Sequence, residues 1–186
     1  MNSTTLLIVG GGTGGHISPG VALYEEFVAA GARAFFLTGK KDARFSSLRD
    51  VAEGDLIYYR APSFSRNIVK LPFFALGFAA AVLRAYVIIK KKRVEAVIGM
   101  GGYVSAPALV AARMAGVPLF LCEQNTVPGK VTAFFAGSAR AVYTTFESTR
   151  DYVRKELRDR LVLAGNPIRK KVLAAPDRES ARRAFN

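Results

Sequence analysis

The chain has 186 residues, 51% of them hydrophobic, which is enough to bury the core of one domain. Its one cysteine, Cys122, excludes an internal disulfide, and no signal-peptide pattern precedes Leu6, so we expect a cytoplasmic protein. The formal net charge of +13 predicts a polyanionic partner, which would be a nucleic acid, an anionic membrane or a phosphorylated ligand.

Seven short apolar segments, each bounded by glycine, proline or polar residues, predict strands that are buried on both faces. Helix-like segments lie between them, and this alternation predicts an α/β fold with a doubly wound, parallel, Rossmann-like sheet. Ligands of such sheets bind beyond the carboxyl ends of the strands. The expected strands lie within residues 5–10, 32–39, 55–61, 95–101, 117–124, 139–145 and 159–166, and the expected helices within 19–30, 72–92, 106–115, 129–136 and 147–158.

A glycine-rich loop follows the first expected strand. Five of the six residues from Gly10 to Gly15 are glycine, and their spacing matches the dinucleotide-binding fingerprint, in which bare backbone amides hold a pyrophosphate. A nicotinamide site also needs an acidic residue at the end of the second strand, where this chain has Lys40 and Lys41. These lysines would suit a 2′-phosphate, so an NADP-dependent oxidoreductase domain is kept as an alternative.

The only histidine, His16, follows this loop directly. Proline favours the first turn of a helix, so Pro19 predicts that the next helix begins there and that His16 lies on the loop. An imidazole beside a bound phosphate can exchange a proton near neutral pH or donate a hydrogen bond. We therefore expect His16 to act on a ligand rather than only to pack the turn.

Residues 71–93 form the longest apolar segment and end in a basic cluster. A membrane-spanning helix would interrupt the series of strands and place Arg84 in hydrocarbon. We expect instead a crossover helix whose outer face binds an anionic membrane, with a non-catalytic membrane-binding module as a further alternative. Nucleic acid is not expected, because no binding motif is present and the basic residues flank aliphatic sequence. The residues expected at the membrane are Arg66, Lys70, Phe73, Phe74, Phe78, Lys90, Lys91, Lys92 and Arg93.

A second glycine-rich loop follows the fourth expected strand. Its glycines, Gly99, Gly101 and Gly102, again leave the backbone bare, and Ser105 is expected to cap the next helix. Because the carboxyl ends of parallel strands share one edge of a sheet, the two loops predict a joint site for an extended diphosphate.

The C-terminal residues predict a boundary between domains. A proline-bounded link follows Asn166, and a helix with Asp177 as its cap then begins and reaches Asn186 without a closing glycine or proline. We expect one domain over residues 1–165, and over 166–186 a linker with the truncated start of a further domain.

Four motifs, GGTGGHISP, GMGGYVSAP, EQNTVPG and GNPIR, occur in an order and at separations that resemble the N-terminal half of the MurG family. These UDP-N-acetylglucosamine transferases convert lipid I to lipid II in peptidoglycan synthesis. The resemblance implies the acceptor-side, Rossmann-like domain of a GT-B enzyme, inactive without its C-terminal donor domain. It also implies inverting transfer of N-acetylglucosamine (GlcNAc) to the C4 hydroxyl of the muramyl unit on undecaprenyl diphosphate, without cofactor, at the cytoplasmic face of the bacterial inner membrane.

The resemblance also implies roles for individual residues. His16 is the candidate base, and Glu123 is a weaker catalytic candidate. No Asp-x-Asp pair is present, so no metal site is expected. Thr132 replaces an asparagine of the family, beside an added Lys130, which leaves any acceptor contact of that amide open. Thr13, Gly14, Gly15, Asn125 and Arg169 are expected to bind UDP-GlcNAc, and Gly11, Gly12, Gly14, Gly15, His16, Gly101, Gly102 and Tyr103 to bind the acceptor diphosphate.

Overall fold

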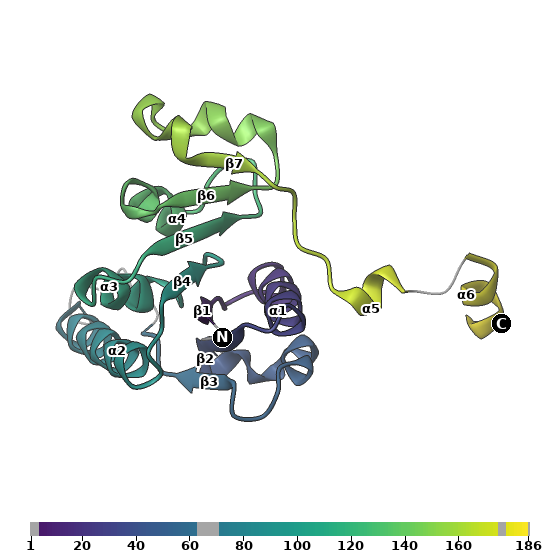
Figure 1. Ribbon diagram of the computed structural model, residues 1–186, viewed down its shortest axis with the longest axis horizontal. Helices are drawn as coiled ribbons and strands as arrows, with labels where there is room; N and C mark the ends of the chain where they lie inside the picture. The colour runs from purple at the N-terminus through teal and green to yellow at the C-terminus, as the bar shows by residue number, and fades with distance from the viewer. Residues whose placement is uncertain (1–3, 63–70, 175–177, 186) are drawn as a thin grey trace.

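Seven parallel strands form one sheet in the order β3-β2-β1-β4-β5-β6-β7 (Figure 1). The computed structural model describes residues 4–62, 71–174 and 178–185. All seven expected strands are present, and the predicted parallel sheet is confirmed. The strands are β1 (Thr5–Val9), β2 (Arg33–Gly39), β3 (Leu56–Tyr59), β4 (Ala96–Gly99), β5 (Leu119–Glu123), β6 (Ala141–Thr144) and β7 (Leu161–Leu163).

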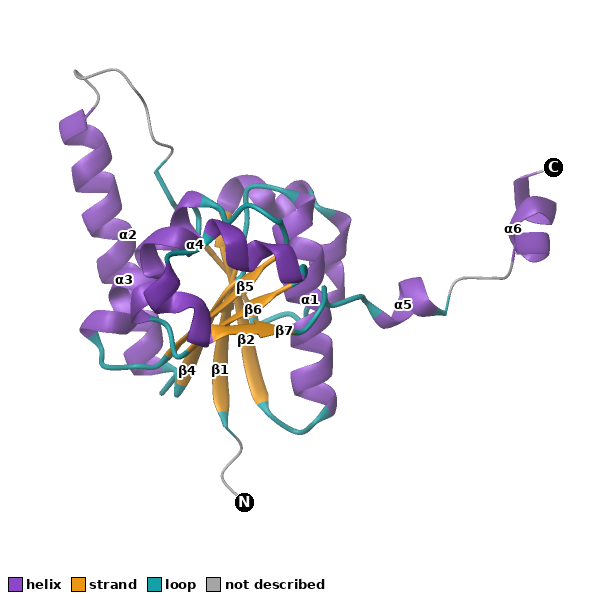
Figure 2. Cartoon of the chain, turned by 90° about the horizontal axis from the view of Figure 1, so that it is seen from above, coloured by secondary structure: helices purple, strands orange, loops and turns teal. Residues whose placement is uncertain are grey.

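Helices cover both faces of the sheet (Figures 1 and 2). Successive side chains of β1 point to opposite faces, so Leu7 packs in one buried cluster with α2 and α3, and Ile8 packs in the other with α1. The short helices α5 and α6 lie away from the sheet (Figure 1). The α-helices are α1 (Gly14–Ala29), α2 (Leu71–Lys91), α3 (Ala106–Met114), α4 (Lys130–Phe135), α5 (Lys170–Leu173) and α6 (Arg178–Phe185), and the 3₁₀ helices are η1 (Lys40–Arg44), η2 (Ser46–Asp50), η4 (Ala136–Ser138), η5 (Glu147–Tyr152) and η6 (Lys155–Arg160).

The strand order reverses at β1, and this reversal brings the two glycine-rich loops together. β1 pairs with β2 on one side and with β4 on the other, and its last residue, Val9, lies opposite Gly99. Because both strands run parallel and end in register, the loops that follow them leave the sheet side by side. This is the position where doubly wound sheets bind their ligands.

The start of α1 differs from the prediction. The helix begins at Gly14, not at Pro19, because Thr13 has the extended backbone of an N-cap and the glycines after it accept helical geometry. Pro19 is buried inside the helix, where its ring nitrogen cannot donate to the carbonyl of Gly15. His16 therefore lies on the first helical turn rather than on a loop.

Residues 147–158 also differ from the prediction. They form the two 3₁₀ helices η5 and η6, which are separated by Val153, with an extended backbone, and Arg154. Thr149 and Leu157, one in each segment, are both buried. Packing at these two points replaces the continuous helix that the local sequence favours.

The apolar helix α2 packs as the expected crossover. It has 21 residues and a mean hydropathy of 1.9, enough by length and composition to cross a membrane. However, it connects β3 to β4 of the same sheet, packs against α3, and buries Ala81, Val82, Ala85 and Ile89 in the core.

Candidate functional site

The two glycine-rich loops touch each other at the carboxyl edge of the sheet. Gly102 has φ +75°, and a Cβ atom built there would lie 2.4 Å from the carbonyl oxygen of Gly11. Gly101 has φ +92°, and its Cβ would lie 3.0 Å from Cδ2 of His16. Only glycine allows both the left-handed backbone and this close approach. The predicted juxtaposition of the two loops is thus confirmed.

His16 lies between these loops, and its surroundings favour the neutral imidazole. Its Nδ1 is 2.9 Å from Oγ1 of Thr13, one helical turn earlier. Burial lowers the pKa of His16 below its ordinary value of 6.5, although the charge of Glu123 and a hydrogen bond to the carbonyl of Gly11 act in the opposite direction. A neutral imidazole can accept a proton, which is what a general base must do.

Asp42, which sequence reasoning missed, holds the first loop in place. Its side chain is buried in η1, and its Oδ1 accepts a hydrogen bond from the amide of Gly12 at 3.1 Å. Its Oδ2 accepts from Thr38 Oγ1 at 2.9 Å and from the amide of Gly39 at 3.1 Å. An acidic residue three positions after the glycine that ends a strand was the available signal. Because a carboxylate occupies the Gly12 amide, that amide is not free for a diphosphate, which corrects the expectation and also weakens the NADP alternative.

Other glycines of the first loop differ in their surroundings: one is packed against Asp42, and two have backbone amides without a helical partner. Gly11 is buried, and a Cβ there would lie 2.3 Å from Asp42 Oδ2, so glycine is needed for close packing, and its contact with a ligand stays a prediction. Gly14 and Gly15 begin α1, and their amides have no carbonyl one turn earlier to bind. Tyr103 of the second loop lies over Gly12, with its Cε1 3.4 Å from the position of a Cβ.

Glu123, at the end of β5, organises a third loop. Its buried carboxylate accepts from the amide and from Nδ2 of Asn125, each at 3.0 Å, through Oε1. It accepts from the amide of Gly129 at 2.9 Å through Oε2. Both oxygens are therefore engaged in positioning this loop, and a catalytic role for Glu123 stays a prediction. The exposed Asn125 side chain keeps its carbonyl oxygen for a ligand.

Gln124 and Thr132 lie next to this third loop. Gln124 donates from Nε2 to the carbonyl of Cys122 at 3.2 Å, while its Oε1 is buried without a partner and lies 4.0 Å from the Cβ position of Gly101. Apart from its place in the EQN motif, the sequence gives no signal for it. Thr132 is buried in α4, where it lines a small pocket with Pro128 and Thr149.

Arg169 does not join the loops. It forms an ion pair of 2.7 Å with Asp50 at the end of η2. Lys171 also contacts Asp50 and is the larger cause of the lowered pKa of that carboxyl group. The next residue, Lys170, pairs with Glu26 of α1 at 3.2 Å. These contacts hold the C-terminal link beside α1, and the role of Arg169 at a sugar nucleotide stays a prediction.

The residues expected at the membrane occupy two separate places. Phe73 is 75% exposed near the start of α2, and Phe74 and Phe78 form a half-buried ring pair with centroids 5.9 Å apart. The exposed Leu76 and Leu83 extend this surface and were missed. Figure 2 shows the first turns of α2 projecting beyond the body of the molecule.

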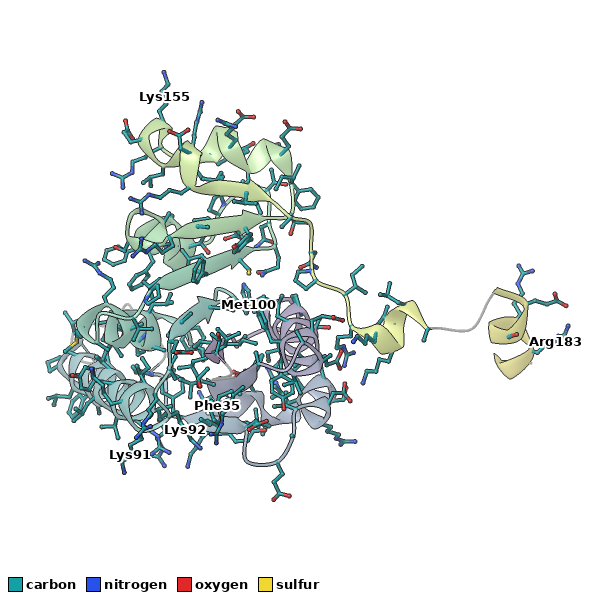
Figure 3. The ribbon with its side chains drawn as sticks, in the orientation of Figure 1. Phe35, Lys91, Lys92, Met100, Lys155 and Arg183 are labelled. Atoms are coloured by element: carbon teal, nitrogen blue, oxygen red, sulfur yellow. The ribbon has the colours of Figure 1, made fainter. Side chains whose placement is uncertain are left out.

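The basic residues after Tyr86 lie at the opposite end of α2, about 26 Å from Phe73 at 1.5 Å per residue. Lys92 lies 4.5 Å above the ring of Phe35 (Figure 3), and Lys90 lies 5.7 Å from the ring of Tyr86. Lys91 and Arg93 are exposed. The phenylalanines and these cations therefore lie at opposite ends of α2, and their joint contact with a membrane stays a prediction. Arg66 and Lys70 lie outside the described residues.

In the part of the chain that the structure describes, no three His, Cys, Asp or Glu side chains lie close enough together to form a metal site.

The similarity to solved structures concerns the fold alone. The chain is similar to MurG of Acinetobacter baumannii, with a TM-score of 0.66, 24% identity, and coverage of 97% of this chain and 48% of that one. It is also similar to the UDP-GlcNAc 2-epimerase of Methanocaldococcus jannaschii, with a TM-score of 0.68, 9% identity, and coverage of 88% and 46%.

Curated relatives are similar in sequence. One from Bradyrhizobium diazoefficiens is 35% identical over 173 residues, which cover 93% of this chain and 47% of the relative. One from Haemophilus ducreyi is 36% identical over 172 residues, with coverage of 90% and 45%. Both are named UDP-N-acetylglucosamine--N-acetylmuramyl-(pentapeptide) pyrophosphoryl-undecaprenol N-acetylglucosamine transferase, and the chain spans about half their length. Residues 6–144 match the glycosyltransferase family 28 N-terminal domain, and the chain therefore belongs to that family.

Proposed function

We propose that this domain is the acceptor-binding half of a transferase that makes lipid II. The enzyme would move GlcNAc from UDP-GlcNAc to the C4 hydroxyl of the muramyl unit in lipid I. Support comes from the family match and from the names of the relatives. Because the chain spans about half of those relatives, residues 1–165 would form the acceptor domain and residues 166–186 the link to a donor domain. Without that donor domain the chain would be inactive.

The observation that carries the proposal is the position of the His16 imidazole between two touching glycine-rich loops. In the reaction, the C4 oxygen bonds to the anomeric carbon of GlcNAc while the bond from that carbon to UDP breaks, which inverts the configuration. His16 would accept the proton of the C4 hydroxyl as this bond forms. The departing electron pair and negative charge go to the diphosphate of UDP, which needs stabilisation by donors near the cleft.

Three groups at the rim would position the two substrates. The amides of Gly14 and Gly15, at the positive end of α1, suit an oxygen of the UDP diphosphate. Tyr103 and the loop at Gly101 would border the acceptor, since both lie against the first loop. The side-chain oxygen of Asn125 can accept a hydrogen bond from a hydroxyl of the donor sugar, because Glu123 already holds its nitrogen.

The acceptor carries a polyprenyl tail, so the domain would attach to the cytoplasmic face of the bacterial inner membrane. The exposed side chains of Phe73, Leu76 and Leu83 on α2 would enter the lipid interface. The basic residues 90–93 would contact anionic headgroups when α2 lies along the surface, each contributing about 1 kcal/mol.

Transfer of radiolabelled GlcNAc from UDP-GlcNAc to a lipid I analogue tests this function in the complete protein. His16→Ala should lower kcat by about 10²- to 10⁴-fold, the usual contribution of a general base, at an unchanged Tm. Lys155→Ala, an exposed change on η6, is the matched control and should keep full activity. Full activity of His16→Ala would exclude His16 as the base. Absence of transfer by the unaltered protein, with vesicle binding retained, would favour the non-catalytic alternative.

A further inference from the structure

A long apolar groove runs between α2 and the C-terminal ends of β2 and β3. Its volume is about 1260 Å³. The α2 wall extends from Gly77 to Ile88, about 16 Å along the helix axis, and the small side chains of Ala80 and Ala81 leave space beside it. Ile57 and Tyr59 line the opposite wall.

The groove is continuous with the site at the glycine-rich loops. Tyr103, which lies over Gly12, also lines the groove, and so does its neighbour Val104. The hydroxyl of Tyr59 donates a hydrogen bond to the carbonyl of Val104, which joins β3 to the second loop. Gly77, which also lines the groove, lies one helical turn from the exposed Phe73. The groove thus leads from the rim of the sheet to the apolar end of α2.

Cationic side chains stand along this groove. Lys40, Lys41 and Arg60 follow the ends of β2 and β3, and Arg84 lies midway along α2. All four are exposed, and within residues 4–62, 71–174 and 178–185 none of them forms an ion pair. The acidic side chain that lines the groove is Asp42, whose two oxygens already accept three hydrogen bonds from the protein. The excess of positive charge favours an anionic ligand.

An apolar channel with cations at its rim fits an amphiphile with an anionic head. We propose that the groove binds the first isoprenoid units of a polyprenyl diphosphate, with Lys40, Lys41, Arg60 and Arg84 binding the diphosphate. This inference rests on the proposed function and specifies how the chain would select its lipid acceptor. The tail leaves the groove at Gly77 and enters the membrane beside Phe73. Recognition then includes the tail itself, in addition to the general attraction of α2 for a bilayer.

Two consecutive alanines of α2 provide the test. Ala80 lines the groove, whereas Ala79 does not, and both are exposed. Calorimetry would compare binding of farnesyl diphosphate and inorganic diphosphate to the protein and its variants. The unaltered protein should bind farnesyl diphosphate at least about tenfold more tightly, because the isoprenoid chain leaves water. Ala80→Trp should remove this preference by filling the groove, and Ala79→Trp should keep it.

Arg84→Gln should weaken binding of both ligands without changing their ratio. Equal affinity of the unaltered protein for the two ligands would overturn the proposal. So would an equal loss of preference in Ala79→Trp and Ala80→Trp, because the effect would then belong to the helix surface in general. Vesicle binding of Ala80→Trp should match that of Ala79→Trp, and a selective loss in Ala80→Trp would assign the groove to the membrane surface instead.

The transfer assay separates this inference from the proposed function. Transfer to lipid I together with equal affinity for the two diphosphates would refute the groove and leave the function intact. Preference for farnesyl diphosphate without any transfer to lipid I would support the groove and refute the proposed function.

Discussion

The rim of the sheet and the outer face of α2 lie on the same domain but are built in opposite ways. At the rim, two buried carboxylates, Asp42 and Glu123, each accept three hydrogen bonds from neighbouring loops. On α2, Phe73 and Leu76 expose most of their surface. Hydrogen bonds depend on direction and distance, whereas burial of apolar surface depends on area alone. Loops that are held by hydrogen bonds suit a site where substrates must be positioned, and exposed apolar side chains suit contact with a fluid membrane.

The largest effect on stability is expected at Asp42. Asp42→Ala removes the acceptor for the amides of Gly12 and Gly39 and for the Thr38 hydroxyl, so unfolding free energy should fall by about 3 kcal/mol and transfer should be lost. Urea denaturation measures the first change. Asp42→Asn, which keeps an acceptor oxygen, should lose less. A loss below about 0.5 kcal/mol, as expected for an exposed substitution such as Glu53→Ala, would contradict the rigid rim.

The contact between the two glycine-rich loops can be tested with a matched pair. Gly102→Ala and Gly116→Ala place alanine at φ +75° and +72°, but only the first directs its methyl group at a backbone atom, Gly11 O, 2.4 Å away. Gly116→Ala should lower the free energy of unfolding by about 1 kcal/mol through backbone strain. Gly102→Ala should lower it by about 3 kcal/mol, because the clash with the carbonyl oxygen adds to the strain. Thermal or urea unfolding measures both. Equal losses would show that the loops do not touch in solution.

Substitutions on the outer face of α2 should affect membranes and hardly affect folding. Phe73→Ser with Leu76→Ser removes two exposed apolar side chains, so stability should change by less than about 0.5 kcal/mol each. Co-sedimentation with anionic vesicles should decrease clearly, because buried apolar area is lost. Binding by the unaltered protein should also weaken with added salt. If the double variant binds vesicles as before, this face is not the membrane contact.

The smallest expected effect is the pH dependence caused by His16. Burial lowers its pKa in the folded chain, so the unfolded chain binds the proton more readily. The neutral form of His16 therefore contributes fully to the free energy of unfolding above pH 6.5. This contribution is lost as the pH falls from 6.5 through the lower pKa that His16 has in the folded chain. Because His16 is the only histidine, urea unfolding at pH 7.5 and 5.5 isolates it, and His16→Gln should remove this part of the difference. A stability that rises on acidification through this range would contradict a neutral His16.

The sequence determined the sheet and the location of the site. Seven apolar segments separated by turn residues specify buried parallel strands, and glycines after the first and fourth place two loops at one edge. The resemblance to MurG, carried by four short motifs, agrees with the family match over residues 6–144. These features are local in the chain, so they can be read without knowing what packs against them.

Only the tertiary structure decided how the site residues are used. Asp42 binds the first loop from thirty residues away, and Arg169 pairs with Asp50 across more than a hundred. Glu123 positions the third loop, and the groove beside Ala80 is lined by residues from α2, from β2 and β3, and from the second loop. Such roles depend on which donors, acceptors and side-chain volumes meet in space. Local sequence sets which groups are available, and packing between distant segments sets which remain free for a ligand.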